Sequence, residues 1–401
     1  MLKGKTVVVG VTGSIAAYKS AQLVSDLVKQ HCDVHVIMTK NALNFIHPVT
    51  FETLTGNKCL TDTFDRNFEF KVTHVSLSQK ADLFMIAPAS ADIIGKLANG
   101  IADDMLSTMV LAAKCKVLIA PAMNQYMYMN PIVQDNIRKL KNYGFGITEP
   151  SVGRLACDAV GPGKLADVDV LLENIIYEIA AEKDLMGLKI LVTAGPTREA
   201  IDPVRYITNH STGKMGYAIA SAAARRGAEV TLISGPAAIK APLFVNRIDV
   251  SSADDMYRAV CAESDKHDIV IMSAAVADYT PSEFIGQKIK KSSSTMSLEL
   301  KRTQDILAYI GKRKKSGQTL CGFSMETENL IENSAKKLQT KNCDMIIANS
   351  IADRGSGFGT DTNKITIITQ DGIKEFDLMS KAEAADRILD RILAYRSKDT
   401  D

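Results

Sequence analysis

An asparagine stands where a buried strand is expected to end in the first half of the chain. Residues 117–120 form the apolar run Val-Leu-Ile-Ala, and Pro-Ala-Met-Asn124 follows it directly. In doubly wound α/β domains, ligands bind at the edge of the sheet where parallel strands end. The amide of Asn124 would offer a donor and an acceptor at the mouth of such a site. An asparagine at this point could equally cap the helix that follows.

A glycine–serine pair stands at a second expected strand end. Residues 5–10 are rich in β-forming side chains and lead through Gly13 and Ser14 into a helix that continues to about Lys29. Backbone N–H groups at the start of a helix can bind a phosphate. Small residues at this turn could also serve only the close packing of the chain.

Two more expected strands end in small or hydroxyl-bearing residues. The strand at residues 34–38 is followed by Thr39, and the strand at residues 81–87 by Pro88-Ala-Ser. Because parallel strands of one sheet end at the same edge, these residues favour a ligand lying across that edge.

A histidine and a cysteine in the first half could carry out proton chemistry. His74 lies in the apolar stretch 72–77, a context more typical of a structural histidine. Cys157 lies in residues 153–165, whose glycines and proline are expected to form neither helix nor regular strand. That segment is predicted to be a loop able to fold over a pocket, although a single cysteine can also be buried and inert.

Length and composition set limits on the class of protein. The 401 residues suffice for two or three domains, and the net charge of +2 gives no case for nucleic acid or a membrane surface as partner. No apolar run approaches the roughly 20 residues that span a bilayer, and no signal peptide is expected. The seven cysteines lack any CxxC spacing, so neither a disulfide framework nor a zinc site is indicated. A cytoplasmic protein is therefore expected.

A second α/β domain is predicted after a short linker. An amphipathic helix at residues 167–182 closes the first domain, residues 183–187 form the linker, and a new strand begins at Leu188. A long loop at residues 202–212 leads into Gly213-Lys-Met-Gly216. This glycine spacing lets a helix lie close to a strand and directs its N-terminus at an anion.

Charged residues of the second domain point to a nucleotide. Asp278 follows the strand at residues 268–273, where it could hold Mg²⁺ or cap a helix. Lys288 lies in the basic segment 287–291, which by itself is typical of a solvated surface. Lysine near a magnesium ligand is, however, the arrangement that a nucleoside triphosphate needs. Lys337 and Lys341, at i and i+4, share one face of a helix.

These motifs together resemble the bifunctional phosphopantothenoylcysteine decarboxylase / phosphopantothenate–cysteine ligase family of coenzyme A biosynthesis. The similarity covers nearly the whole chain in the family's order, and one position differs, Asp158, where the family usually has glycine. The residues that carry it are 13–19, His74, 88–92, 121–124, 156–157, 194–199, 209–216, 274–279 and 288–291.

The resemblance implies a flavodoxin-like doubly wound first domain (1–182) that binds FMN, followed by a Rossmann-like α/β ligase domain (188–401). The FMN phosphate and ring system would be held by Gly13, Ser14, Ile15, Thr39, Pro88, Ala89 and Ser90. In the family the substrate thiol is oxidised to a thioaldehyde, which accepts the electrons left when carbon dioxide departs. His74 would act as the base, Asn124 would bind the substrate carboxylate, and Cys157 would protonate the resulting ene-thiol.

The resemblance also implies that the second domain joins 4′-phosphopantothenate to cysteine. The acid would attack CTP to give an acyl-cytidylate, with Asn209 orienting this intermediate and Mg²⁺ bound at Asp278. The CTP-binding residues would be Met272, Ser273, Ala274, Asp278, Lys288, Gln304, Asp305, Ile306, Leu307, Phe323, Lys337 and Lys341. The ligase product is the decarboxylase substrate, so the fusion would raise its local concentration.

Family precedent implies a homo-oligomer with a trimeric flavin domain and a dimeric ligase domain. Two other functions remain open. Similar flavoproteins decarboxylate the C-terminal cysteine of a peptide, but they correspond only to the first half of the chain. Other relatives are flavin-binding regulatory proteins, which tend to carry long acidic tails or to lack part of the His/Asn/Cys set that is present here.

Overall fold

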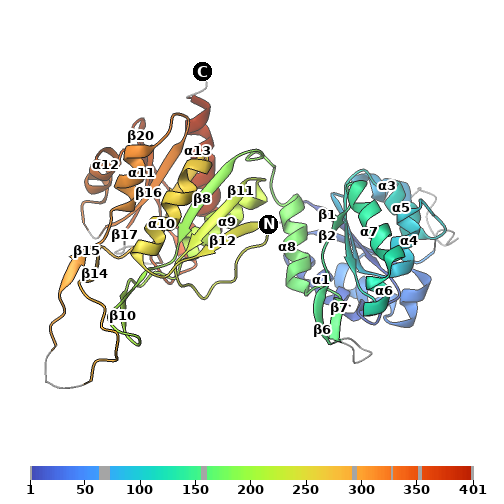
Figure 1. Cartoon of the computed structure of the whole chain (residues 1–401). Coiled ribbons are helices and arrows are strands. Elements are labelled where there is room, and N and C mark those ends of the chain that lie inside the picture. Colours follow the sequence, from blue (N-terminus) through green and yellow to red (C-terminus); the bar gives the residue numbers. More distant parts are fainter. Residues whose placement is uncertain are drawn as a thin grey trace. The chain divides into compact units, whose positions relative to one another are not determined.

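The first sheet is entirely parallel. In the computed structural model, which describes residues 2–62, 73–154, 160–290, 296–326, 328–350 and 355–398, the chain forms two units, Met1–Glu182 and Lys183–Asp401 (Figure 1). The strands of the first unit follow the order β2-β1-β3-β4-β5, which is that of flavodoxin-like domains. This confirms the predicted fold. The strands are β1 (Thr6–Val11), β2 (Asp33–Met38), β3 (Leu83–Ala89), β4 (Lys116–Pro121) and β5 (Gly146–Ile147).

Helices cover both faces of this sheet. Because side chains alternate along a strand, Val7 and Val9 of β1 face one apolar core and Val8 faces the other. The first core includes α1 (Ala17–Lys29), α2 (Pro48–Thr55) and α8 (Val168–Ile179). The second includes α4 (Ala91–Ala98), α5 (Met105–Leu111) and α7 (Pro131–Asn142). The shorter helices are η1 (Lys40–Asn44), α3 (Thr73–Lys80) and α6 (Gln125–Met129).

Part of the predicted loop 153–165 is a strand, so that prediction was wrong. β6 (Ser151–Arg154) pairs antiparallel with β7 (Val160–Lys164), with an irregular register near Val152. A two-stranded hairpin tolerates Pro162 because each of its strands has an unpaired edge. Gly163 is required for a different reason: its φ is +126°, and a Cβ there would lie 2.5 Å from the carbonyl oxygen of Met123.

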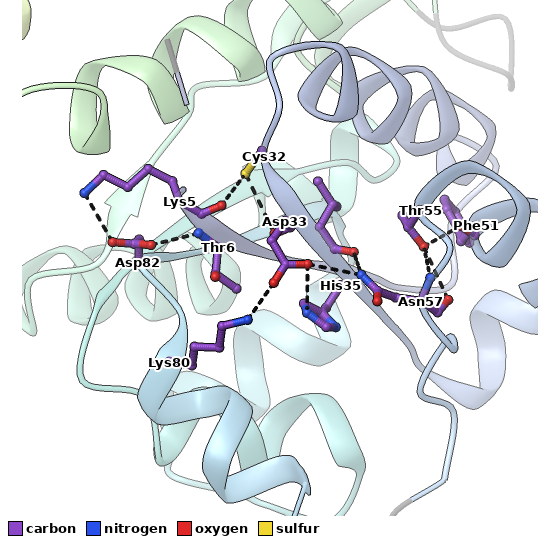
Figure 2. Close-up of polar contacts among 11 residues, drawn as sticks. Lys5, Thr6, Cys32, Asp33, His35, Phe51, Thr55, Asn57, Lys80 and Asp82 are labelled. Atoms are coloured by element: carbon purple, nitrogen blue, oxygen red, sulfur yellow. Dashed lines mark hydrogen bonds and ion pairs between the residues drawn. The ribbon is translucent and has the colours of Figure 1, made fainter. Parts of the chain in front are cut away.

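A polar cluster holds the opposite, amino-terminal edge of the first sheet together (Figure 2). Asp33, at the start of β2, accepts hydrogen bonds from Lys80 Nζ (2.7 Å) and Asn57 Nδ2 (3.2 Å). Burial alone would raise the pKa of Asp33, but Lys80 and the neighbouring His35 and Asn57 lower it. Asp82, just before β3, accepts a hydrogen bond from the backbone N–H of Thr6 (2.8 Å). We assign this edge a structural role.

The second sheet has a Rossmann-like order. Its eight strands run β12-β11-β8-β13-β16-β17-β19-β20, and the first six, which are parallel, have the order 3-2-1-4-5-6 of dinucleotide-binding domains. This confirms the predicted second α/β domain. The strands are β8 (Lys189–Ala194), β11 (Glu229–Ser234), β12 (Val245–Asp249), β13 (Ile269–Met272), β16 (Thr319–Glu326), β17 (Met345–Ser350), β19 (Thr366–Thr369) and β20 (Gly372–Glu375).

Helices again flank the sheet. One apolar core contains side chains of α10 (Ala253–Glu263), α11 (Ile306–Arg313) and α12 (Leu330–Thr340). α9 (Lys214–Arg225) packs on β8 and β11, and α13 (Lys381–Lys398) packs on α9. A 3-10 turn, η2 (Ser264–Lys266), follows α10. Among the described residues, no helix is both long and apolar enough to cross a lipid bilayer.

Three short antiparallel pairs complete the second unit. They are β9 (Arg198–Ala200) with β10 (Tyr206–Thr208), β14 (Tyr279–Pro281) with β15 (Leu300–Arg302), and β18 (Thr362–Asn363) with β21 (Met379–Ser380). β10 lies inside the stretch 202–212 that was predicted to be a loop throughout. Strands of two or three residues are too short to produce an alternating pattern in the sequence.

The residues of the predicted linker, 183–187, belong to the second unit. Leu185 is fully buried, and its backbone N–H donates to the carbonyl of Arg226 (2.9 Å). Asp184 accepts a hydrogen bond from Arg226 Nε (2.8 Å). This segment is therefore held at the C-terminal end of α9 by a backbone hydrogen bond and an ion pair to Arg226.

Candidate functional site

The ends of β1 and β3 meet at the point where the strand order of the first sheet reverses. The hydroxyl of Thr12 donates to the carbonyl of Pro88 (2.7 Å) and accepts a hydrogen bond from the backbone N–H of Ser90 (2.9 Å). Ligands of doubly wound sheets bind at such a reversal point. The predicted phosphate turn and the 88–90 segment therefore flank the expected site directly.

The turn after β1 offers unpaired backbone donors. Within the described residues, the N–H groups of Gly13, Ser14 and Ile15 make no hydrogen bond. A Cβ at Gly13 would lie 2.7 Å from Cβ of Asn41, so the glycine also permits close packing of this turn against η1. The close-packing interpretation is therefore confirmed at Gly13, and phosphate binding stays a prediction. Donors at this turn fit an anionic group such as a flavin phosphate.

The remaining predicted flavin residues surround this turn. Thr39 stands between β2 and η1, and its backbone N–H donates to the carbonyl of Val11 (3.0 Å). Ser90 caps α4 by accepting a hydrogen bond from the N–H of Ile93 (3.4 Å). Ala89 is fully buried. These contacts fix the backbone on either side of the strand reversal.

Asn124 is the N-cap of α6, as the alternative interpretation of its sequence position predicted. Its Oδ1 accepts a hydrogen bond from the N–H of Tyr126 (2.8 Å). The preceding residue, Met123, donates its N–H to the carbonyl of Gly163 in β7 (3.0 Å). Because a carboxylate accepts hydrogen bonds, the amide nitrogen, which is a donor, is the atom of Asn124 suited to it.

The other two predicted catalytic residues of the first unit are not placed by the structure. His74 is the second residue of α3, where only the backbone is described. Cys157 and Asp158 lie outside the described residues. The proposed base and proton donor stay predictions.

A pocket of about 730 Å³ opens at the carboxyl edge of the second sheet. It lies beyond the ends of β13 and β16, beside the start of α9, and it is large enough for a nucleotide. All the predicted CTP-binding residues except Lys288 line it: Met272, Ser273, Ala274, Asp278, Gln304, Asp305, Ile306, Leu307, Phe323, Lys337 and Lys341.

Lys337 of α12 and Lys341, which follows the last residue of this helix, line the pocket. Lys337 Nζ donates to the carbonyl of Phe323 (2.7 Å), and burial lowers the pKa of this lysine. Lys341 forms an ion pair with Asp305, the N-cap of α11. Burial would raise the pKa of Asp305, but Lys341 lowers it. In the part of the chain that the structure describes, Lys341 thus has a carboxylate partner at this wall and Lys337 forms no ion pair.

Asp278 lines the pocket with an exposed side chain. Strand β14 follows it, so the alternative prediction that it caps a helix was wrong. Among the described residues, no group of three or more His, Cys, Asp or Glu side chains could hold a metal by itself. One carboxylate nevertheless fits Mg²⁺ that takes its other ligands from phosphates and water.

Asn209 and Lys288 occupy different positions relative to this pocket. The amide nitrogen of Asn209 donates to the carbonyls of Ala275 (3.0 Å) and Val276 (3.3 Å), two residues that line it. Lys288 is exposed and does not line the pocket. Its neighbour Ile289 is anchored, since its N–H donates to Asp202 Oδ2 (3.1 Å).

Small residues bring α9 against the end of β8, as the glycine spacing predicted. A Cβ at Gly216 would lie 2.5 Å from Cβ of Ala194. Gly213 has a φ of +82°, and a Cβ there would lie 3.2 Å from the backbone nitrogen of Gly195. The helix N-terminus is thereby held at the pocket.

Sequence reasoning missed several lining residues. Lys214 lies within the glycine motif and could have been found there. Lys381, at the start of α13, carries no local signal, because its place in the pocket depends on the packing of the last helix on α9. Ser211, Arg302, Asn349 and Asn363 also line the pocket.

Both units match described protein families. Residues 1–180 match the family described as flavoprotein, and residues 185–395 match the DNA/pantothenate metabolism flavoprotein C-terminal domain. The chain is 48% identical over 404 residues to the coenzyme A biosynthesis bifunctional protein CoaBC of Bacillus subtilis, covering 100% of this chain and 99% of that protein.

A second relative is the protein of the same name from Haemophilus influenzae, which is 42% identical over 397 residues, 99% of each chain. Among solved structures, the C-terminal domain of such a CoaBC protein is 44% identical. It covers 55% of this chain and 100% of its own, with a TM-score of 0.47.

Proposed function

Since the chain belongs to the family of coenzyme A biosynthesis bifunctional proteins, we propose a chemical course and a set of residues for each of its two reactions. The chain carries out two consecutive steps of coenzyme A biosynthesis, the ligation of phosphopantothenate with cysteine and the decarboxylation of the product. The second unit performs the ligation and the first unit the decarboxylation.

The pocket of the second unit is the observation that supports the ligase proposal. A free carboxylate is a poor acylating agent, so the carboxylate of 4′-phosphopantothenate attacks the α-phosphorus of CTP. The bond to the β-phosphate breaks, pyrophosphate leaves, and an acyl-cytidylate forms. The amine of cysteine then attacks the acyl carbon and releases CMP. Asp278 would hold Mg²⁺, which would neutralise the charge of the triphosphate.

Asn209 and Lys288 are the residues that we assign to the chemistry of the ligase. Asn209 orients the acyl-cytidylate, a role supported by its hydrogen bonds to Ala275 and Val276 at the pocket wall. Lys288 stabilises the negative charge that develops during activation. Its backbone neighbour Ile289 is held in place by Asp202, which supports a defined position for this segment.

The first unit binds FMN at the reversal of its sheet. Within the described residues the N–H groups of residues 13–15 are unpaired; together with Thr39 and the segment 88–90 they would hold the phosphate and ring system of the flavin. Flavin, when bound, supplies reversible two-electron oxidation of the substrate thiol. Asn124 binds the substrate carboxylate through its amide nitrogen; a cationic group there would stabilise the carboxylate and oppose its loss. His74 acts as the base, and Cys157 supplies the proton for the ene-thiol.

The proposal extends to assembly and location. A trimeric first domain and a dimeric second domain follow from the family resemblance, and light scattering of the purified protein tests this. The cytoplasm is the proposed location, because the free thiols of both reactions persist in a reducing compartment.

Purified protein supplied with 4′-phosphopantothenate, cysteine, Mg²⁺ and CTP tests both reactions at once. Pyrophosphate, carbon dioxide and product masses are followed together. We expect pyrophosphate, carbon dioxide and 4′-phosphopantetheine. The cysteine adduct alone would contradict the decarboxylase assignment in a flavin-loaded protein. Absence of all products from a folded protein would contradict both and favour a regulatory flavin-binding protein.

A further inference from the structure

A loop after β17 forms one wall of the pocket and is held by three side chains. Four successive carbonyl oxygens, those of residues 357–360, each accept a hydrogen bond from outside the loop. Lys381 Nζ donates to residues 357 (2.9 Å) and 360 (2.6 Å). The Thr212 hydroxyl donates to residue 358 (2.5 Å), and Lys214 Nζ donates to residue 359 (2.9 Å). The loop is thus fixed by the two lysines and one hydroxyl.

The charge at this wall is not balanced. Lys381 is only 6% exposed, and both of its acceptors are neutral carbonyls. Lys214 also contacts the carboxylate of Asp361 (2.6 Å), but that side chain is 89% exposed. A buried ammonium whose nearby anion is solvent-exposed is poorly stabilised. Burial, followed by the charge of Lys214, lowers the pKa of Lys381, and the charge of Asp361 offsets only part of that shift.

Each ammonium retains hydrogen-bonding capacity. A lysine has three N–H donors, and both Lys214 and Lys381 use two of them on the loop and its flank. In the described part of the chain, neither lysine has a third partner, and both line the pocket. An anionic group entering here could accept a charge-assisted hydrogen bond from each lysine and would add to the countercharge that the exposed Asp361 supplies.

We propose that Lys214 and Lys381 form a phosphate-binding subsite at this wall of the pocket. The proposal rests on the nucleotide-dependent ligase proposed above. Two reactants of that ligase carry suitable groups: the terminal phosphates of CTP and the phosphomonoester of 4′-phosphopantothenate. The same two lysines hold the 357–360 loop in place, so the residues of the subsite also fix this wall of the pocket.

Calorimetric titration of the full-length protein in Mg²⁺ tests this subsite with CTP, CMP, pyrophosphate and 4′-phosphopantothenate. The variants are Lys214→Met and Lys381→Met. Thr212→Val is the matched control, since it removes a hydrogen bond to the loop without removing a charge. Thermal denaturation verifies that each variant is folded. If Lys381→Met does not fold, Lys214→Met, at the more exposed lysine, is used alone.

If the terminal phosphates of CTP occupy the subsite, the affinities for CTP and pyrophosphate should fall about tenfold or more in both lysine variants. The affinity for CMP should be unchanged. If the phosphomonoester occupies the subsite, only the affinity for 4′-phosphopantothenate should fall by this amount. Unchanged affinities for all ligands would overturn the subsite, as would an equal loss in Thr212→Val. If wild-type protein binds pyrophosphate through these lysines but not CTP, the subsite stands and the proposed ligase fails.

Discussion

The side-chain amide nitrogen of Asn209 donates a hydrogen bond to the backbone carbonyl oxygen of Ala275, at a distance of 3.0 Å. This contact joins the segment after β10 to the end of β13, where the pocket opens. Asn209→Asp would set a carboxylate against the carbonyls of Ala275 and Val276. We expect the ligase to lose about a hundredfold or more in rate, measured as pyrophosphate release.

The decarboxylase serves as the internal control for Asn209→Asp. Supplied directly with 4′-phosphopantothenoylcysteine, the variant should release carbon dioxide at the wild-type rate. Asn246→Asp, an exposed asparagine on β12, should leave both activities unchanged. Equal loss of both activities in Asn209→Asp would indicate misfolding and not a role in ligation.

Lys288→Gln tests the activation step of the ligase. Removal of a positive charge near the developing negative charge should reduce the burst of pyrophosphate by about tenfold to a hundredfold. Lys290→Gln is the matched control, because Lys290 is also exposed and lies two residues away in the same segment. A normal burst in Lys288→Gln, or the same loss in both variants, would exclude a specific role for Lys288.

Asp202 is expected to position the segment that carries Lys288. Its fully buried carboxylate accepts hydrogen bonds from the N–H groups of Val204 (2.8 Å) and Ile289 (3.1 Å). The side chain of Arg205 holds the pKa of Asp202 well below its usual range. Asp202→Asn should therefore increase hydrogen exchange in residues 282–290 and slow pyrophosphate release.

Asp254→Asn is the control for this variant, since Asp254 forms an exposed ion pair with Arg258 on α10. It should change neither the exchange nor the rate. Slower ligation with unchanged exchange in residues 282–290 would contradict positioning through the backbone of Ile289.

Binding of CTP should weaken at alkaline pH because of Lys337. Burial lowers its pKa from the ordinary 10.5, so its ammonium loses a proton at a lower pH than an exposed lysine does. Below that lowered pKa the cation is present and favours the triphosphate; above it, the attraction is lost. Lys337→Gln should weaken binding by about tenfold at neutral pH and remove this part of the pH dependence. An unchanged alkaline profile in the variant would assign the effect to another group.

Much of the fold could be predicted because its parallel strands are short apolar runs that end in small or polar residues. The same signal located the edge at which Asp278 and Phe323 line a pocket. It could not locate Lys381, whose position depends on how the last helix packs on α9.

The prediction failed where local composition and tertiary context disagree. Gly161 and Pro162 argue against a strand, yet they form β7 because an isolated hairpin has free edges. Asn124 shows a different difficulty: one side chain both caps α6 and lies at the sheet edge. Sequence alone presented these as alternatives.

Gly13→Ala tests the proposed flavin phosphate site. The added Cβ would lie 2.7 Å from Cβ of Asn41, so the turn must move and its N–H groups at residues 13–15 would shift. We expect less bound flavin per chain, measured by absorbance of the purified protein, and a lower melting temperature. Gly95→Ala is the matched control: it lies within α4, and the nearest atom to its Cβ would be 3.8 Å away. Alanine there should keep the flavin content and leave the melting temperature equal or higher. Full flavin content in Gly13→Ala would place the phosphate elsewhere.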